Sequence, residues 1–121
     1  MITLDNIEVF ITRFYAKVNR DELLSPIFNQ VAEVDWNEHI PKICKFWNSV
    51  LLKTGEYRDN AYQKHIDLAK LTPIDVKHFD RWLELFSKQA YIDFSVEDAD
   101  FVISKANTIA RSLKMGVIAP L

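Results

Sequence analysis

Glycine, cysteine and clustered charge are all scarce in this sequence. Only two glycines occur among 121 residues, Gly55 and Gly116, and this excludes the glycine-rich loops that bind dinucleotides or nucleoside triphosphates. The lone Cys44 excludes an intrachain disulfide and is compatible with a reducing compartment. It lies within an apolar run, so we interpret it as a small buried side chain rather than a reactive thiol.

The chain also lacks a large net charge and long apolar runs. The 15 basic and 17 acidic residues leave a net charge of -2, and no run of Lys or Arg occurs, so we expect no nucleic-acid partner. No apolar stretch reaches membrane-spanning length, and the first residues lack the basic and apolar parts of a secretory signal. We therefore expect no membrane association and a cytoplasmic location.

Aromatic and apolar residues are abundant by contrast. Apolar residues make up 49% of the chain, and eight Phe, four Tyr and three Trp are many for its length. These rings either fill a core or line a pocket for a flat ligand. A chain of 121 residues fits one domain, and we assign residues 1–121 to it.

The spacing of apolar residues predicts an all-α fold. Apolar side chains recur three and four positions apart along most of the chain, and nothing alternates with period two over a convincing length. We therefore expect helices and no sheet. The predicted helices span about residues 4–19, 21–31, 35–53, 72–91 and 95–116.

Several helix ends carry recognisable signals. Asp35 is a good N-cap, but Pro41 would remove a hydrogen bond from the helix that follows. Either the first turn is irregular or the regular helix begins nearer Ile40. Thr72 is expected to cap the next long helix, with Pro73 as its first residue. For the last helix we expect Ser95 as the N-cap and Gly116 as the C-cap.

Histidines are the candidate metal ligands. No two of the three are spaced for a tetrahedral zinc site, and no nucleophile–base pair is visible. His39 falls on the apolar face of its predicted helix. His65 lies in the short polar stretch 57–68, from which an imidazole can hold a metal-bearing ligand. These two residues, with Tyr15 and Trp82 on two further helices, are either ordinary core and loop residues or parts of one ligand site.

A series of short motifs favours the ligand site. They are Phe14-Tyr15, Leu24-Ser25-Pro26-Ile27-Phe28-Asn29, Trp36-Asn37-Glu38-His39, Phe46-Trp47, Tyr57 followed by His65, His78-Phe79-Asp80-Arg81-Trp82-Leu83-Glu84-Leu85-Phe86, and Ile109-Ala110-Arg111-Ser112-Leu113. Their joint order and spacing resemble a group III truncated haemoglobin. The resemblance covers nearly the whole chain and implies a two-over-two helical sandwich around haem b, which is iron protoporphyrin IX.

The resemblance also implies roles for single residues. His65 matches the proximal ligand of the haem iron, with its other ring N–H bonded to a backbone carbonyl near Ala61. Tyr15, His39 and Trp82 match polar distal residues that face a bound gas, and Trp82 also borders the haem. The remaining expected haem contacts are Phe14, Phe28, Ile43, Phe46 and Tyr57, with Lys42 as a propionate partner.

The sequence departs from the family's usual pattern at three positions, of which Pro41, beside the distal segment, is one. Asp59 and Ala61 replace a Gly and a Pro that usually precede the proximal histidine. His78 matches no functional position, so we expect it on the surface.

The expected function is gas binding at a five-coordinate haem iron. Donors in a dry pocket stabilise the partial negative charge of bound O₂, which predicts high O₂ affinity and slow release. The same site suits NO, CO or peroxide, detoxification of NO or reactive oxygen, and a still unidentified electron donor. The alternatives are a haem-dependent peroxidase and a haem-free helical interaction or sensor module. We assign no dedicated catalytic residue.

Overall fold

The computed structural model is built from helices whose apolar faces follow the spacing described above. It describes residues 1–32, 35–55, 57, 60–72 and 74–117. Within these ranges the chain forms five α-helices and one short π-helix, with no strand, and the all-α prediction is confirmed. The elements are α1 (Leu4–Val18), η1 (Ile27–Val31), α2 (Trp36–Leu52), α3 (Ala61–Ala69), α4 (Val76–Asp93) and α5 (Val96–Val117).

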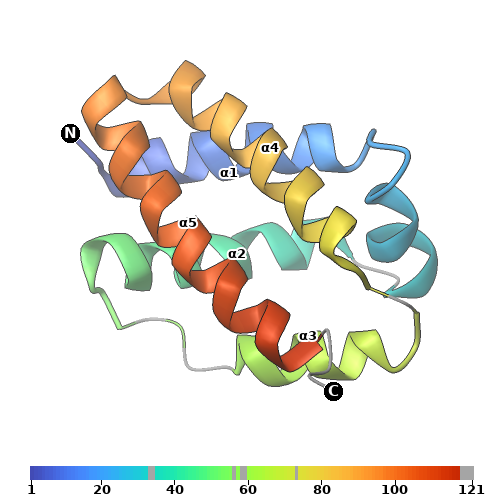
Figure 1. Ribbon diagram of the computed structural model, residues 1–121. Helices are drawn as coiled ribbons and strands as arrows, with labels where there is room; N and C mark the ends of the chain where they lie inside the picture. The colour runs from blue at the N-terminus through green and yellow to red at the C-terminus, as the bar shows by residue number, and fades with distance from the viewer. Residues whose placement is uncertain (33–34, 56, 58–59, 73, 118–121) are drawn as a thin grey trace.

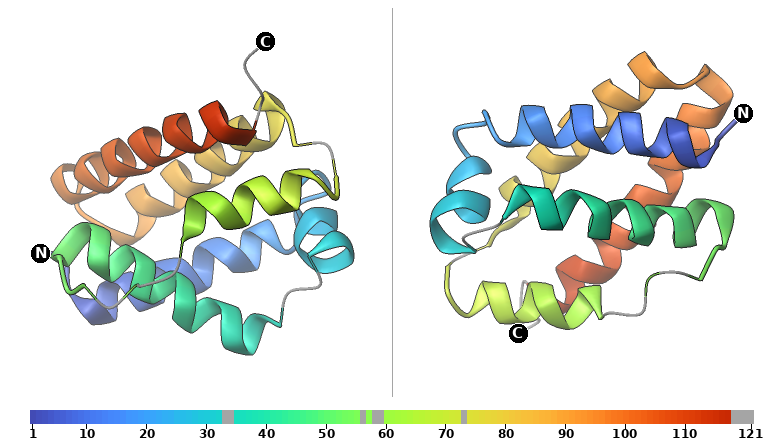
Figure 2. Two further views of the ribbon diagram at one scale, coloured as in Figure 1. Left: turned by 90° about the horizontal axis from the view of Figure 1, so that it is seen from below. Right: turned by 180° about the vertical axis from the view of Figure 1, so that it is seen from behind.

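The four long helices form two antiparallel pairs that cross each other. In Figure 1, α1 and α2 run across the molecule, while α4 and α5 pass diagonally over them. The two views in Figure 2 show the same two layers. The expected two-over-two sandwich is therefore confirmed. The short α3 lies at one edge, beyond α2 and beside the C-terminal part of α5 (Figure 1).

The core lies where α1 meets the second layer. The inward stripe of α1 is almost completely buried, with exposures between 0% and 1% for Ile7, Phe10, Ile11 and Phe14. Phe10 packs edge-on against Phe86 of α4 with ring centroids 4.9 Å apart. Burying side chains of this size contributes roughly 1.5–3 kcal/mol each, so this stripe anchors α1 firmly to α4.

Helix α2 starts at Trp36 and runs without interruption through Pro41. Asp35 caps it, because its carboxylate accepts a hydrogen bond from a first-turn backbone N–H at 3.0 Å. The alternative start near Ile40 is therefore wrong. The helix ends as expected before Lys53, which itself adopts the left-handed conformation with φ of 57°.

Helix α4 begins later than predicted. Its N-cap is Asp75 rather than Thr72, and its first residue is Val76. Asp75 and His78 bond each other's backbone N–H groups in a reciprocal capping box. Thr72 instead closes the turn after α3, while Pro73 lies outside the described residues.

The predicted start of helix α5 is confirmed, but its predicted end is wrong. The Ser95 hydroxyl accepts a hydrogen bond from a first-turn N–H at 3.2 Å, as an N-cap does. Gly116 lies inside the helix rather than after it. A Cβ atom at this position would lie 2.3 Å from the Tyr62 hydroxyl oxygen, so the glycine makes room for a ring of α3. None of the described helices has the length and apolar character that a bilayer crossing requires.

Candidate functional site

A cavity of about 530 Å³ lies between α2, α3 and the second helical layer. This is within the range of roughly 300–1,000 Å³ that ligand pockets occupy. Its walls are mainly apolar and aromatic, and they include three of the predicted positions, Phe28, Ile43 and Phe46. The cavity therefore suits a flat and largely apolar ligand.

His65 projects into this cavity from α3. Asn60 starts the helix by accepting a hydrogen bond from the Gln63 N–H at 3.0 Å. One turn further on, Nδ1 of His65 lies 2.7 Å from the carbonyl oxygen of Ala61. A carbonyl can only accept, so the proton of the neutral ring sits on Nδ1 and the lone pair on Nε2.

The expected bond to the Ala61 carbonyl is thus present, although Ala61 is one of the departures from the family pattern. Its backbone makes the contact, so the side chain that replaces proline does not prevent it. Asp59, another of the departures, lies outside the described residues.

Tyr15 and Trp82 form a polar pair in another part of the cavity wall. Tyr15 is 8% exposed, and the Trp82 indole N–H donates to its hydroxyl oxygen over 3.4 Å. Burial raises the pKa of Tyr15 to about 12, although the hydrogen bond from Trp82 acts in the opposite direction. The phenol is therefore neutral at ordinary pH. Because its oxygen accepts from the indole, its own hydrogen is available to a ligand.

His39 faces the cavity from the first part of α2, as its position on the apolar face predicts. Its ring packs edge-on against Trp36 with centroids 5.6 Å apart. Burial lowers the pKa of His39, and the electrostatic influence of the nearby Lys42 lowers it further. The imidazole is thus held in its neutral form, in which one nitrogen donates and the other accepts.

Lys42 and Tyr57 border the same cavity. Lys42 follows His39 by one turn of α2, and its side chain is exposed. The Tyr57 backbone N–H donates to the Ser49 hydroxyl at 3.0 Å, and its ring packs edge-on against Phe46 with centroids 5.2 Å apart. These contacts tie the segment before α3 to α2.

Phe14 does not line the cavity, contrary to the expectation that it contacts the ligand. It is completely buried behind the polar pair. Its ring lies edge-on to Tyr15 at 4.6 Å and to Trp82 at 5.2 Å. Phe14 therefore supports the donors, while the neighbouring Tyr15 reaches the cavity.

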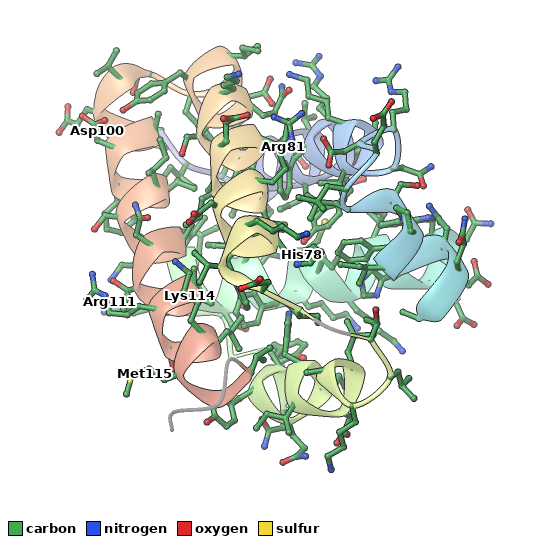
Figure 3. The ribbon with its side chains drawn as sticks, turned by 45° about the vertical axis from the view of Figure 1, so that its right-hand side comes forward. His78, Arg81, Asp100, Arg111, Lys114 and Met115 are labelled. Carbon is green, nitrogen blue, oxygen red and sulfur yellow. The ribbon has the colours of Figure 1, made fainter. Side chains whose placement is uncertain are left out.

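His78 was expected on the surface and is only partly exposed there. It is half-buried and lines the cavity, because Nδ1 accepts the Asp75 backbone N–H at 2.9 Å and holds the ring against the start of α4. Figure 3 shows it at this end of α4. The Asp-x-x-His pattern could have indicated a capping pair. The lining residues Ile109 and Leu113 of α5 were predicted only as core positions.

Comparison with known proteins was made for sequence and for structure. No family model matches the chain. The group 3 truncated hemoglobin ctb of Campylobacter jejuni is 34% identical over 112 residues, which cover 90% of this chain and 86% of that protein. A crystal structure of group III truncated hemoglobin from Campylobacter jejuni matches with a TM-score of 0.87 and 32% identity, covering 97% of this chain and 92% of the other. The chain belongs to the group III truncated haemoglobin family.

Proposed function

We propose that this protein binds O₂ at the iron of a haem b group that His65 ligates, beside a polar wall formed by Tyr15 and Trp82. Membership of a haemoglobin family implies a haem group and a gaseous ligand. The observation that carries the residue assignment is the 2.7 Å contact between His65 Nδ1 and the Ala61 carbonyl in the wall of a cavity of about 530 Å³.

The cavity fits a porphyrin in shape and chemistry. Aromatic and aliphatic side chains such as Phe28, Ile43 and Phe46 suit the faces of a macrocycle. The exposed Lys42 at the border offers a cation to a carboxylate side chain of the porphyrin. The bound haem would supply an iron centre with an open position for a diatomic gas.

His65 is held in an orientation that suits ligation of an iron. The hydrogen bond from Nδ1 to the Ala61 carbonyl fixes the tautomer and the ring orientation, and it makes Nε2 a stronger donor of its lone pair. Metal-bound histidines commonly donate such a hydrogen bond from their other ring nitrogen.

Tyr15 and Trp82 would select among gases by charge. O₂ accumulates more negative charge on binding than CO does, and each charge-assisted hydrogen bond is worth roughly 1.5–3 kcal/mol. Tyr15 keeps its proton because of its raised pKa, and the Trp82 N–H lies beside it in a contact of 3.4 Å. The pair therefore favours O₂ and slows its release, which suits O₂ handling or the removal of NO and reactive oxygen.

The direct test replaces His65 with glycine. We expect His65→Gly to be purified without the Soret band of haem and to regain it when hemin and imidazole are added together. His78→Gln is the matched control, because this residue is also a histidine of the cavity wall, and we expect it to retain haem. A His65→Gly protein that binds haem as tightly as wild type would contradict the assignment. A colourless wild-type protein that ignores added hemin would support a haem-free helical module instead.

A peroxidase is the second candidate, and the lowered pKa of His39 favours it. A neutral imidazole at the cavity wall can accept a proton from peroxide, which is a step that general-base catalysis requires. We expect peroxide turnover above that of free hemin if this activity is physiological. His39→Leu should then reduce turnover by at least about tenfold, given the usual contribution of a general base.

A further inference from the structure

A buried carboxylate joins helix α4 to the turn after α1 and to the segment that follows this turn. The side chain of Asp21 is 6% exposed, and its Oδ1 accepts the Arg81 Nε–H at 2.6 Å. Its Oδ2 accepts the backbone N–H groups of Leu23 at 3.2 Å and Leu24 at 3.1 Å. A buried carboxylate that accepts three hydrogen bonds holds the groups that donate them in a fixed arrangement.

The two ends of this connection, Asp21 and Arg81, lie near the elements that carry Tyr15 and Trp82. Asp21 closes the turn after α1, the helix that carries Tyr15, through its N–H to the Val18 carbonyl at 3.1 Å. Arg81 directly precedes Trp82 on α4. Figure 3 shows Arg81 one turn along α4 from His78. Leu24 itself lines the cavity.

We infer that Asp21 is a positioning residue for the donor pair, acting through Arg81 on Trp82. The contact from the Trp82 indole to the Tyr15 hydroxyl is 3.4 Å, at the long end for a hydrogen bond. A small displacement of α4 relative to α1 therefore decides whether the two groups meet. The inference rests on the proposed function, because it concerns donors that face a bound gas.

The charge of Asp21 supports this role. Burial alone would raise the pKa of its carboxyl group, but the hydrogen bonds from Arg81, Leu24 and Leu23 and the Arg81 charge outweigh this effect and lower it. Arg81 also bonds Glu84 on the same helix, so its guanidinium is held from two sides. Asp21 and Arg81 thus form an ion pair at neutral pH.

The chain contains a matched control pair. Arg13 of α1 and Asp93 of α4 also form an ion pair at 2.6 Å, and the Asp93 side chain is 4% exposed. This pair joins the same two helices, but it lies at the far end of α4 from Trp82. Loss of either pair should loosen the contact between the helices, whereas only loss of the Asp21–Arg81 pair should disturb the donors.

The experiment compares Asp21→Asn and Asp93→Asn in the haem-loaded protein. The readouts are the Fe–CO stretching frequency, the rates of O₂ and CO dissociation, and the hydrogen exchange of the Trp82 indole N–H. For Asp21→Asn we expect a shifted frequency, faster indole exchange, and O₂ release accelerated roughly three- to tenfold with CO release unchanged. For Asp93→Asn we expect wild-type values of all four, even if its melting temperature falls as much.

Two further variants make the test specific. Arg81→Lys keeps the positive charge but removes the Nε–H donor, and we expect the same changes as in Asp21→Asn. It also serves if Asp21→Asn fails to fold. In a Trp82→Phe background, Asp21→Asn should have no additional effect on O₂ release, because the two residues then act as one unit.

The possible outcomes separate the two proposals. If Tyr15→Phe changes the ratio of O₂ to CO release while Asp21→Asn and Arg81→Lys do not, the positioning role is wrong and the donor role stands. If Asp93→Asn changes the ratio as much as Asp21→Asn does, the effect is general loosening and the positioning role is again wrong. If Tyr15→Phe itself leaves the ratio unchanged, the donor role in the proposed function fails.

Discussion

Helices α1 and α3 border the same cavity but are built in very different ways. Six residues of α1 are buried, including Tyr15, and they pack into the aromatic core shared with α4. None of the nine residues of α3 is buried. His65 is therefore carried by a helix that has little core of its own. The protein completes the Tyr15 side of the pocket by itself, whereas the His65 side depends on the molecule that fills the cavity.

The difference in packing between α1 and α3 should have its largest effect when haem is removed. We expect the backbone amides of α3 in the apo-protein to exchange close to the unprotected rate, since local opening of a poorly packed element costs almost no free energy. The amides of α1 and α4 should keep protection close to the global value. Hydrogen exchange followed by mass spectrometry measures both helices in one experiment. Equal protection of α1 and α3 in the apo-protein would remove the distinction.

Truncation of a ring in the core and of a ring in the cavity wall should have different consequences. Phe10→Ala should lower the free energy of unfolding by about 3–5 kcal/mol in the apo- and haem-loaded forms alike, because Phe10 is 1% exposed in the core. Phe28→Ala removes a half-buried ring of the cavity wall and should mainly speed haem loss. Urea unfolding and hemin transfer to an acceptor protein measure the two effects. A reversal of these two patterns would contradict the division.

Tyr15→Phe tests the α1 side of the pocket, because it removes only the hydroxyl group that would bond a ligand. We expect O₂ dissociation to accelerate by roughly tenfold to a hundredfold and CO dissociation to change little, as loss of a charge-assisted hydrogen bond of about 1.5–3 kcal/mol predicts. Stopped-flow ligand replacement measures both rates. The fold should survive, because Phe14 and Phe86 keep the core beneath this position filled.

Gly116→Ala tests the attachment of α3. The added methyl group would collide with the Tyr62 ring, so the ring and part of α3 must move. Tyr62 is 44% exposed and can turn outwards, so we expect a loss of only about 1 kcal/mol in stability, with faster haem loss as the clearer sign. Gly55→Ala is the comparison outside α3: nothing lies within 4 Å of its added methyl group, but the φ of 72° strains an alanine there, so we expect a loss of about 1 kcal/mol in stability without faster haem loss.

The smallest expected effect concerns pH. The folded-state pKa of Asp21 lies below its unfolded value, so its stabilisation is complete above about pH 4 and is lost as the pH falls through the folded pKa. Asp21→Asn should therefore be less stable than wild type at neutral pH and lose less on acidification. Urea unfolding between neutral and acidic pH gives this slope. Parallel slopes for the two proteins would show that Asp21 titrates alike in both states.

The periodic parts of the sequence were sufficient to predict the helices. The stripe from Ile7 to Val18 indicated α1 and its buried face correctly, because a spacing of three and four residues is repeated over about three turns. The ends were harder to predict. Thr72 and Asp75 are both suitable caps, and only the tertiary position of α4 and the side chain of His78 select Asp75.

The site was predictable only as far as local geometry extends. Phe14 and Tyr15 are neighbours that point in directions about 100° apart on a helix, and spacing did not show which of them reaches the cavity. The surroundings of His78 were not predicted, because the family motif indicates neither its capping partner Asp75 nor the cavity wall. The bond from His65 to the Ala61 carbonyl was predictable, since both atoms belong to one helical turn.

The contact between Gly116 and Tyr62 makes these two positions depend on each other in evolution. Bulk at position 116 is compatible with this placement of α3 only if position 62 becomes smaller, because the methyl group would overlap with ring atoms as well as with the hydroxyl oxygen. Relatives that keep an aromatic residue at position 62 should therefore keep glycine at position 116, and the two should change together. A library that varies both codons and is sorted for haem retention would recover this covariation directly.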